Sequence, residues 1–263
     1  MKSRRIFRNL YIYLVLLLLF LPIFILVAFS FNESKLNVVF TGFTFDWYGR
    51  LFENSDLLDA FKNTILIALI STAVSTVLGT LAAVGLQKFN FRGKAFIDKL
   101  LYIPIVIPEI VLGIALLSVF TLAKLELSFW TVLLAHISFS VPFVTTSVRS
   151  TLYAFPKHVE SAASDLGASR WQVFWYVTLP MLKPGIVAGA LLAFTLSLDD
   201  VVISYFAAGP GTNTLPLYIY ANIKTGISPD VNALTTIMLV ITVITLTVSA
   251  HYQSKRVIER SAK

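Results

Sequence analysis

Residues 156–189 read PKHVESAASDLGASRWQVFWYVTLPMLKPGIVAG, a polar and then aromatic stretch that joins two apolar runs. The stretch begins with helix-forming residues, reaches Gly167, and becomes aromatic before Pro180. Pro156 suits the start of one short helix, Gly167 its left-handed C-terminal cap, and Ser169 the N-cap of a second helix. The order therefore predicts two short helices joined at a glycine, outside the apolar part of the fold and in need of a docking partner.

Six apolar runs surround this stretch. Hydrophobic residues make up 57% of the 263 residues and charged residues 13%, with a mean hydropathy of +0.80, whereas a soluble domain is about a quarter charged. Crossing about 30 Å of hydrocarbon takes about 20 residues, and each run is that long. We therefore expect an all-α integral membrane protein with six transmembrane helices. The runs are 10–31, 64–86, 100–123, 129–148, 185–206 and 233–252.

The gaps between the runs bound the domain organisation. The longest gaps, 32–63 and 149–184, are shorter than the roughly 50 residues of a small domain, so we expect no soluble domain. The expected parts are an N-terminal transmembrane helix with an external segment over 1–59, a core transmembrane domain over 60–252, and a tail over 253–263.

Basic residues are placed unevenly along the chain. If the six helices alternate in direction, one side of the membrane receives sixteen of the 21 Lys and Arg residues and the other side five. The positive-inside rule then places both termini in the cytoplasm. The net charge of +7 is thus a topology signal, and we expect no nucleic-acid partner. The external loop 32–63 carries five acids against three bases, a balance suited to a cationic solute.

The usual signatures of an enzyme are missing from the sequence. There is no G-x-x-x-x-G-K-[ST], no H-E-x-x-H, no serine nucleophile elbow and no cysteine, and the three histidines are scattered. We expect no catalytic residue, no metal site and no ATP bound by this chain.

Small residues recur at steps of four in the second and fifth runs, a pattern that lets membrane helices approach closely. In the third run, Pro104 and Pro108 predict a bend, because proline frees a backbone carbonyl. The two stripes are Ser71, Ser75, Gly79 and Ala83, and Gly185, Gly189, Ala193 and Ser197.

Three acids lie inside apolar runs: Glu109, which follows Pro108, and the pair Asp199 and Asp200. A charge at the bilayer centre costs about 2.5–3.5 kcal/mol on insertion scales, so such acids usually face a cavity or a partner. On a continuous helix Asp199 and Asp200 point about 100° apart and cannot share one target. Either they are counter-charges for a cationic solute, or one caps an unwound turn or pairs with an arginine such as Arg149.

Residues 156–184 resemble the EAA loop of the permeases of binding-protein-dependent ABC importers. The family pattern is E-A-A, three residues, G, nine residues and I-x-L-P, and this chain keeps every spacing. The matching positions are Ala162, Ala163, Gly167, Leu179 and Pro180.

Two positions depart from the family pattern. Ser161 occupies the position of the glutamate, with Glu160 one residue earlier, and Val177 replaces the isoleucine. Because one residue turns about 100° around a helix, Glu160 does not face the way the family's glutamate does. The resemblance implies that Glu160, Ser161 and the matching positions couple the chain to an ATPase.

Beyond the loop, the chain is similar to the spermidine/putrescine permeases of this family along nearly its whole length. The similarity is strongest in 91–94 (FRGK), 194–202 (FTLSLDDVV) and 228–234 (SPDVNAL), and Trp47 and Glu109 match a tryptophan and an acid. It implies a substrate path through Trp47, Glu109, Asp199 and Asp200, because carboxylates and aromatic faces can replace the water around a polyamine.

The resemblance also implies the assembly. We expect a type I ABC importer permease fold in the lipid of a bacterial inner membrane, beside a second, homologous permease subunit. Two ATPase subunits, which carry the ATP and Mg, would dock on the cytoplasmic loop, and an extracytoplasmic binding protein would deliver polyamines.

Three other functions remain open at this point. The chain could be an importer permease for another small solute, or a structural subunit. It could also be an ion-coupled secondary transporter in which the same acids carry protons. A secondary transporter predicts inverted repeats and broken helices, which the sequence does not show, and it leaves residues 156–184 unexplained.

Overall fold

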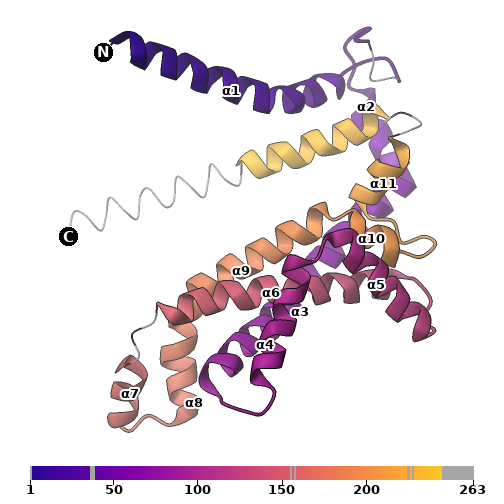
Figure 1. Ribbon diagram of the computed structural model, residues 1–263. Helices are drawn as coiled ribbons and strands as arrows, with labels where there is room; N and C mark the ends of the chain where they lie inside the picture. The colour runs from indigo at the N-terminus through magenta and orange to yellow at the C-terminus, as the bar shows by residue number, and fades with distance from the viewer. Residues whose placement is uncertain are drawn as a thin grey trace. The chain divides into compact units, whose positions relative to one another are not determined.

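The computed structural model describes residues 2–35, 39–154, 156, 158–223, 226 and 228–244, with side chains from residue 7 onward. Over these residues the chain is helical, and the nearest thing to a strand in them is one isolated bridge between Asn32 and Phe43 (Figure 1). The chain divides into two compact units: unit 1 comprises residues 1–58 and 221–263, and unit 2 comprises residues 59–220. The predicted tail, 253–263, lies outside the described residues.

Unit 1 begins with a long apolar helix, α1 (Lys2–Phe29). Every side chain from Phe7 to Ile25 is exposed, and a helix that is apolar on all sides is suited to lipid. A short segment follows, with α2 (Asp46–Arg50) and the 3₁₀ turn η1 (Leu51–Glu53). The unit also holds an apolar helix over Pro229–Ile244.

The second predicted run belongs to a longer helix, α3 (Ser55–Lys88). It begins nine residues before the apolar run, because the side chain of Asn54 accepts the backbone N–H of Leu57 at 3.1 Å and so caps the first turn. Part of the predicted external loop 32–63 is therefore helical.

Unit 2 is built on α3, α6 (Phe129–Tyr153) and α9 (Leu179–Asp199). A side-chain carbon added at Gly79 would lie 2.7 Å from Val144 of α6, and one at Gly189 would lie 3.1 Å from the same residue. The predicted close approach of helices at the small-residue stripes is therefore confirmed. In lipid this van der Waals packing replaces the hydrophobic effect as the force that holds helices together.

The third predicted run is two helices rather than one. The chain bends by 117° between helices α4 (Lys94–Val106) and α5 (Glu109–Leu122). Pro108 forces the residue before it out of the helical region, and Ile107 is accordingly extended, with φ −72° and ψ 136°. The predicted bend is confirmed, and the break at Ile107 divides the run into two helices.

The fifth predicted run is also interrupted. Helix α9 ends at Asp199, Asp200 is extended with φ −66° and ψ 124°, and a short helix, α10 (Val202–Ala207), follows. One continuous helix over 185–206 is therefore wrong. In the structure the backbone N–H groups after the break are bonded to the side chain of Asp200.

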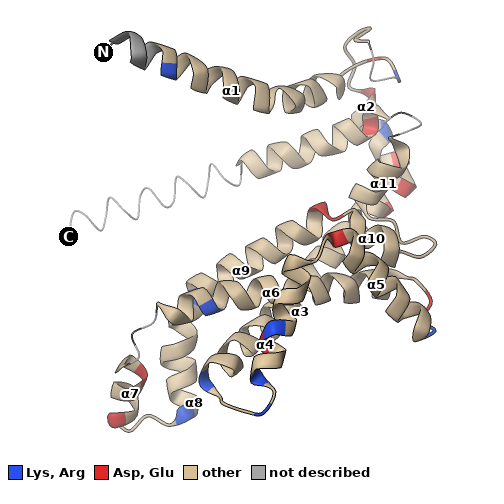
Figure 2. Cartoon of the chain, viewed as in Figure 1, with Lys and Arg blue, Asp and Glu red and all other residues tan. Residues whose placement is uncertain are grey.

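Between α6 and α9 lie α7 (His158–Asp165), α8 (Arg170–Val173) and the π-helical turn η2 (Phe174–Thr178), and α11 (Leu215–Asn222) follows α10. Four helices in the described chain are long and apolar enough to cross a membrane, or five if α4 and α5 form one span. The sixth predicted run, 233–252, continues past Ile244, the last described residue. Most basic residues of unit 2 gather at the end that carries α7, α8 and the start of α4 (Figure 2).

Candidate functional site

A pocket of about 320 Å³ lies where the two helix breaks of unit 2 meet. All three acids predicted from the sequence, Glu109, Asp199 and Asp200, line this pocket. The geometric reason for keeping Asp199 and Asp200 apart does not hold, because it assumed a continuous helix and α9 ends at Asp199. The apolar part of the wall includes Ile105, Leu112, Phe139, Phe143 and Leu196.

Glu109 and Asp199 are the exposed acids of the pocket. Glu109 is the first residue of α5 and Asp199 is the last residue of α9. Within the described chain, neither carboxylate has a hydrogen bond or an ion pair to another residue. A carboxylate at a helix C-terminus lies at the negative end of the helix dipole, so the charge of Asp199 favours a nearby cation.

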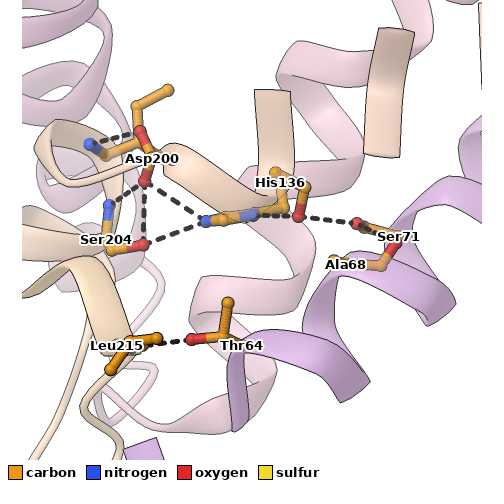
Figure 3. A network of polar contacts seen from close by, with 9 residues as sticks. Thr64, Ala68, Ser71, His136, Asp200, Ser204 and Leu215 are labelled. Atoms are coloured by element: carbon orange, nitrogen blue, oxygen red, sulfur yellow. Dashed lines mark hydrogen bonds and ion pairs between the residues drawn. The ribbon is translucent and has the colours of Figure 1, made fainter. Parts of the chain in front are cut away.

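Asp200, in contrast, is hydrogen-bonded to its neighbours through both carboxylate oxygens. Its oxygens accept the backbone N–H of Ile203 at 3.1 Å, and the backbone N–H and the hydroxyl of Ser204 at 2.7 and 2.8 Å. Nε2 of His136 lies 3.3 Å away, and the Asp200 side chain is only 5% exposed (Figure 3). This geometry is the one expected of an acid that caps an unwound turn.

The alternative partner named from the sequence, Arg149, is engaged elsewhere. Its guanidinium forms an ion pair with Asp98 of α4 and donates to the hydroxyl of Tyr153 at 3.1 Å. Arg149 therefore joins α6 to α4 and contacts neither of the acids at the α9–α10 break.

His136 is a residue of this site that the sequence argument missed. It lies on α6 and is completely buried, with Nδ1 2.7 Å from Oγ of Ser197 and Nε2 3.0 Å from Oγ of Ser204. One signal was available: His136 stands inside an apolar run, and ionisable residues within membrane helices are usually functional or paired. Counting the histidines as scattered overlooked its position.

Trp47 belongs to unit 1, whereas the three acids belong to unit 2. It is buried, and its indole N–H donates to the backbone carbonyl of Asn32 at 2.7 Å. The guanidinium of Arg50 lies 5.1 Å from the centre of its ring, within the range of a cation–π contact.

The loop between α7 and α8 forms the predicted glycine turn. Gly167 has φ +89°. The N–H of Ala168 donates to the carbonyl of Ala163 at 3.1 Å, and the N–H of Gly167 to that of Ser164 at 2.9 Å, which is the Schellman pattern. Ser169 caps α8 in a capping box with Gln172. The left-handed cap and the second N-cap are therefore confirmed.

Glu160 on α7 turns toward the rest of unit 2. Its carboxylate accepts hydrogen bonds from Nζ of Lys88 at 2.7 Å and from the hydroxyl of Thr178 at 2.6 Å. Partial burial raises the pKa of the Glu160 carboxyl, but these two hydrogen bonds and the charge of Lys88 more than offset it, and the pKa lies below its ordinary value. Glu160 thus links α7 to the end of α3 and to η2.

The other predicted coupling residues lie on the outer side of the loop or at the start of α9. Ser161 and Ala162 are exposed and Ala163 is half-buried, while Leu179 is half-buried and Pro180 exposed. Glu160 and Ser161 line a groove of about 990 Å³ together with Lys88, Ser164 and Trp171, among others. Leu166 and Trp171, both large and apolar, are 90% and 74% exposed.

Comparison with known proteins gives the family. Residues 75–261 match the family described as binding-protein-dependent transport system inner membrane component. The chain is 41% identical over 239 residues, 91% of its length and 93% of the relative's, to the spermidine/putrescine transport system permease protein PotC of Haemophilus influenzae. It is 43% identical to PotC of Escherichia coli K12 over 226 residues, 86% of each protein.

The fold agrees with this result. A crystal structure of a bacterial ABC transporter involved in the import of the acidic polysaccharide alginate superposes with a TM-score of 0.71 at 17% identity, covering 96% of this chain and 98% of that one. At this identity the likeness shows the fold alone. Sequence and fold together show that this chain belongs to the family of binding-protein-dependent transport system inner membrane components, the permease subunits of ABC importers.

Proposed function

We propose that this permease subunit forms part of the translocation path for polyamines. One observation carries the proposal: two carboxylates without an ion-pair partner among the described residues, Glu109 and Asp199, line one pocket at the α4–α5 and α9–α10 breaks. A charged group in a membrane protein needs compensation, and here the compensating charge is absent from the described residues around it. A cationic cargo would supply that charge during transport.

The rest of the pocket suits a polyamine in particular. Ammonium groups would bind the carboxylates through charge-assisted hydrogen bonds, and the methylene segments would pack on the apolar wall that Phe139, Phe143 and Leu196 form. The names of the two PotC relatives point to the same cargo class. In this proposal Asp200 shapes the pocket, and Trp47, whose ring is buried beside Arg50, contributes no direct contact with the cargo.

The proposed topology has six spans with both termini in the cytoplasm. Support comes from the basic residues, which collect at the end of unit 2 that carries α7 and α8, as the positive-inside rule requires for a cytoplasmic end. The fourth and fifth spans would then be α6 and α9, and the sixth would continue from Pro229–Ile244.

The proposed partners are a second, homologous permease chain, two ATPases that carry ATP and Mg, and an external binding protein for the cargo. Exposed Leu166 and Trp171 beside the groove of the α7–α8 loop support an ATPase docking surface there, because apolar residues this exposed outside the spans favour a protein contact. The family description itself names a binding-protein-dependent system.

One argument against the secondary-transporter alternative no longer holds, and another has taken its place. The sequence argument counted the absence of broken helices against it, yet α4–α5 and α9–α10 are both broken. Membership of the binding-protein-dependent family and a structured α7–α8 loop now weigh against that alternative instead.

The test is uptake of labelled spermidine, putrescine and an uncharged solute by proteoliposomes that hold the permease with its partner subunits and binding protein. Glu109→Gln and Asp199→Asn should each lower polyamine uptake at least about tenfold with normal assembly, since each loses a charge-assisted bond. Glu126→Gln is the matched control, an exposed acid of the α5–α6 loop that does not line the pocket. Normal uptake in both pocket variants would refute the cargo assignment, and uptake of only the uncharged solute would favour another importer.

A further inference from the structure

His136 stands at the centre of a polar network that spans the break between α9 and α10. Its Nδ1 is 2.7 Å from Oγ of Ser197, which precedes the break, and its Nε2 is 3.0 Å from Oγ of Ser204, which follows it. The same Nε2 lies 3.3 Å from Oδ2 of Asp200, in the break itself (Figure 3). One imidazole on α6 therefore contacts both sides of the interruption.

The network continues to a fourth helix, α3. Oγ of Ser197 is 3.2 Å from Oγ of Ser71 on α3, and Ser71, His136 and Ser204 are all completely buried. A buried hydrogen bond in a region of low dielectric is stronger than one in water, so losing it costs free energy. Removing the imidazole would take one partner from Ser197 and one from Ser204, which would keep only Ser71 and Asp200 respectively.

Local sequence alone does not hold the break open. The run 185–206 has the composition of one continuous span, and α10 has only six residues, too few for a helix to be stable without tertiary contacts. If the break closed into a continuous helix, Asp199 and Asp200 would point about 100° apart. The pocket that they now share would be lost.

We propose that His136 is a positioning residue of the cargo pocket: its Nε2 holds Ser204 and Asp200 against α6 at the helix break and so keeps Asp199 facing the pocket beside Glu109. The inference rests on the proposed function for its transport consequence. It divides the acids into two kinds, with Asp200 engaged in the fold and Asp199 and Glu109 available to cargo.

Two substitutions distinguish the contacts of Nδ1 from those of Nε2. The amide of Asn reaches the position of Nδ1, so His136→Asn keeps the contact with Ser197 and loses those with Ser204 and Asp200. The longer His136→Gln reaches the position of Nε2, so it keeps the contacts with Ser204 and Asp200 and loses the one with Ser197. Thr64→Val is the control, because Thr64 is a buried residue that accepts the N–H of Leu215 at 2.6 Å and does not line the pocket.

The first readout is the kinetics of polyamine uptake by the assembled importer. His136→Asn should raise the KM for spermidine about tenfold, since an oriented bond to a charged group is lost, with assembly and ATP hydrolysis retained. His136→Gln and Thr64→Val should stay within about twofold of the unsubstituted protein. Equal kinetic effects of Asn and Gln, or loss of the assembled complex in both, would overturn the proposal.

The second readout does not depend on cargo. The chain has no cysteine, so Asp199→Cys provides a single thiol at the edge of the break, and its labelling by a water-soluble methanethiosulfonate can be timed. Adding His136→Asn should slow labelling at least about threefold, and adding His136→Gln should not. Unchanged labelling would overturn the proposal. A difference in labelling between Asn and Gln would uphold it, and if the protein with its native Asp199 took up no polyamine, that result would refute the cargo alone.

Discussion

Replacing Gly167 with valine tests whether the α7–α8 turn transmits force between this permease and the ATPase proposed to dock on it. Gly167 has φ +89°, and a side-chain carbon built there meets no atom within 4 Å. The substitution therefore creates backbone strain and no steric clash. We expect the turn to be destabilised while insertion of the chain into the membrane is unaffected.

The magnitude follows from the backbone alone. A left-handed conformation costs an L-residue about 1–2 kcal/mol, and a β-branched residue lies at the upper end of that range. Such a cost lowers the population of the correctly turned loop about 5- to 30-fold relative to its alternatives. The two Schellman bonds, from Gly167 to Ser164 and from Ala168 to Ala163, are the contacts that would be lost.

The assay is ATPase co-purification and polyamine-stimulated ATP hydrolysis in reconstituted complexes. Gly93→Val is the matched control, because Gly93 has φ +88°, also faces open space, and lies in a different turn, before α4. Gly167→Asn should recover much of the activity, since asparagine tolerates this conformation. Equal losses at both glycines, or unchanged coupling in Gly167→Val, would refute a mechanical role for the turn.

Two further predictions concern the loop and the topology. Glu160→Gln should weaken ATPase association by up to about fivefold, since a partly exposed ion pair contributes up to about 1 kcal/mol. In the unsubstituted protein the contribution of the ion pair between Glu160 and Lys88 should be constant above pH 4.5, the ordinary pKa of glutamate. It should fall only as the pH drops through the lowered pKa of Glu160. A loss of ATPase association that begins near pH 7 would contradict this role of Glu160. A reporter fused after Lys263 should be cytoplasmic and one inserted at Asn54 external, and the reverse result would overturn the orientation.

The membrane class, the close helix approach and the glycine turn were all predictable from local features of the chain. Apolar runs, small residues at steps of four and the Gly167–Ser169 spacing each act over a few residues. They therefore predicted close approach at the stripes of α3 and α9 and the left-handed cap, but not that α6 is the helix both stripes contact. The role of Glu160 was not predictable in this way, because its partners Lys88 and Thr178 come from elsewhere in the chain.

The sequence by itself determined that acids stand inside membrane spans, because a charge among apolar residues is visible without any structure. Only the tertiary structure decided what each acid does. Asp200 is engaged because His136 on α6 and Ser204 on α10 reach it, and Asp199 shares its pocket because the helix ends between the two. A break in an apolar run depends on partners that are distant along the chain, and hydropathy and helical periodicity contain no information about them.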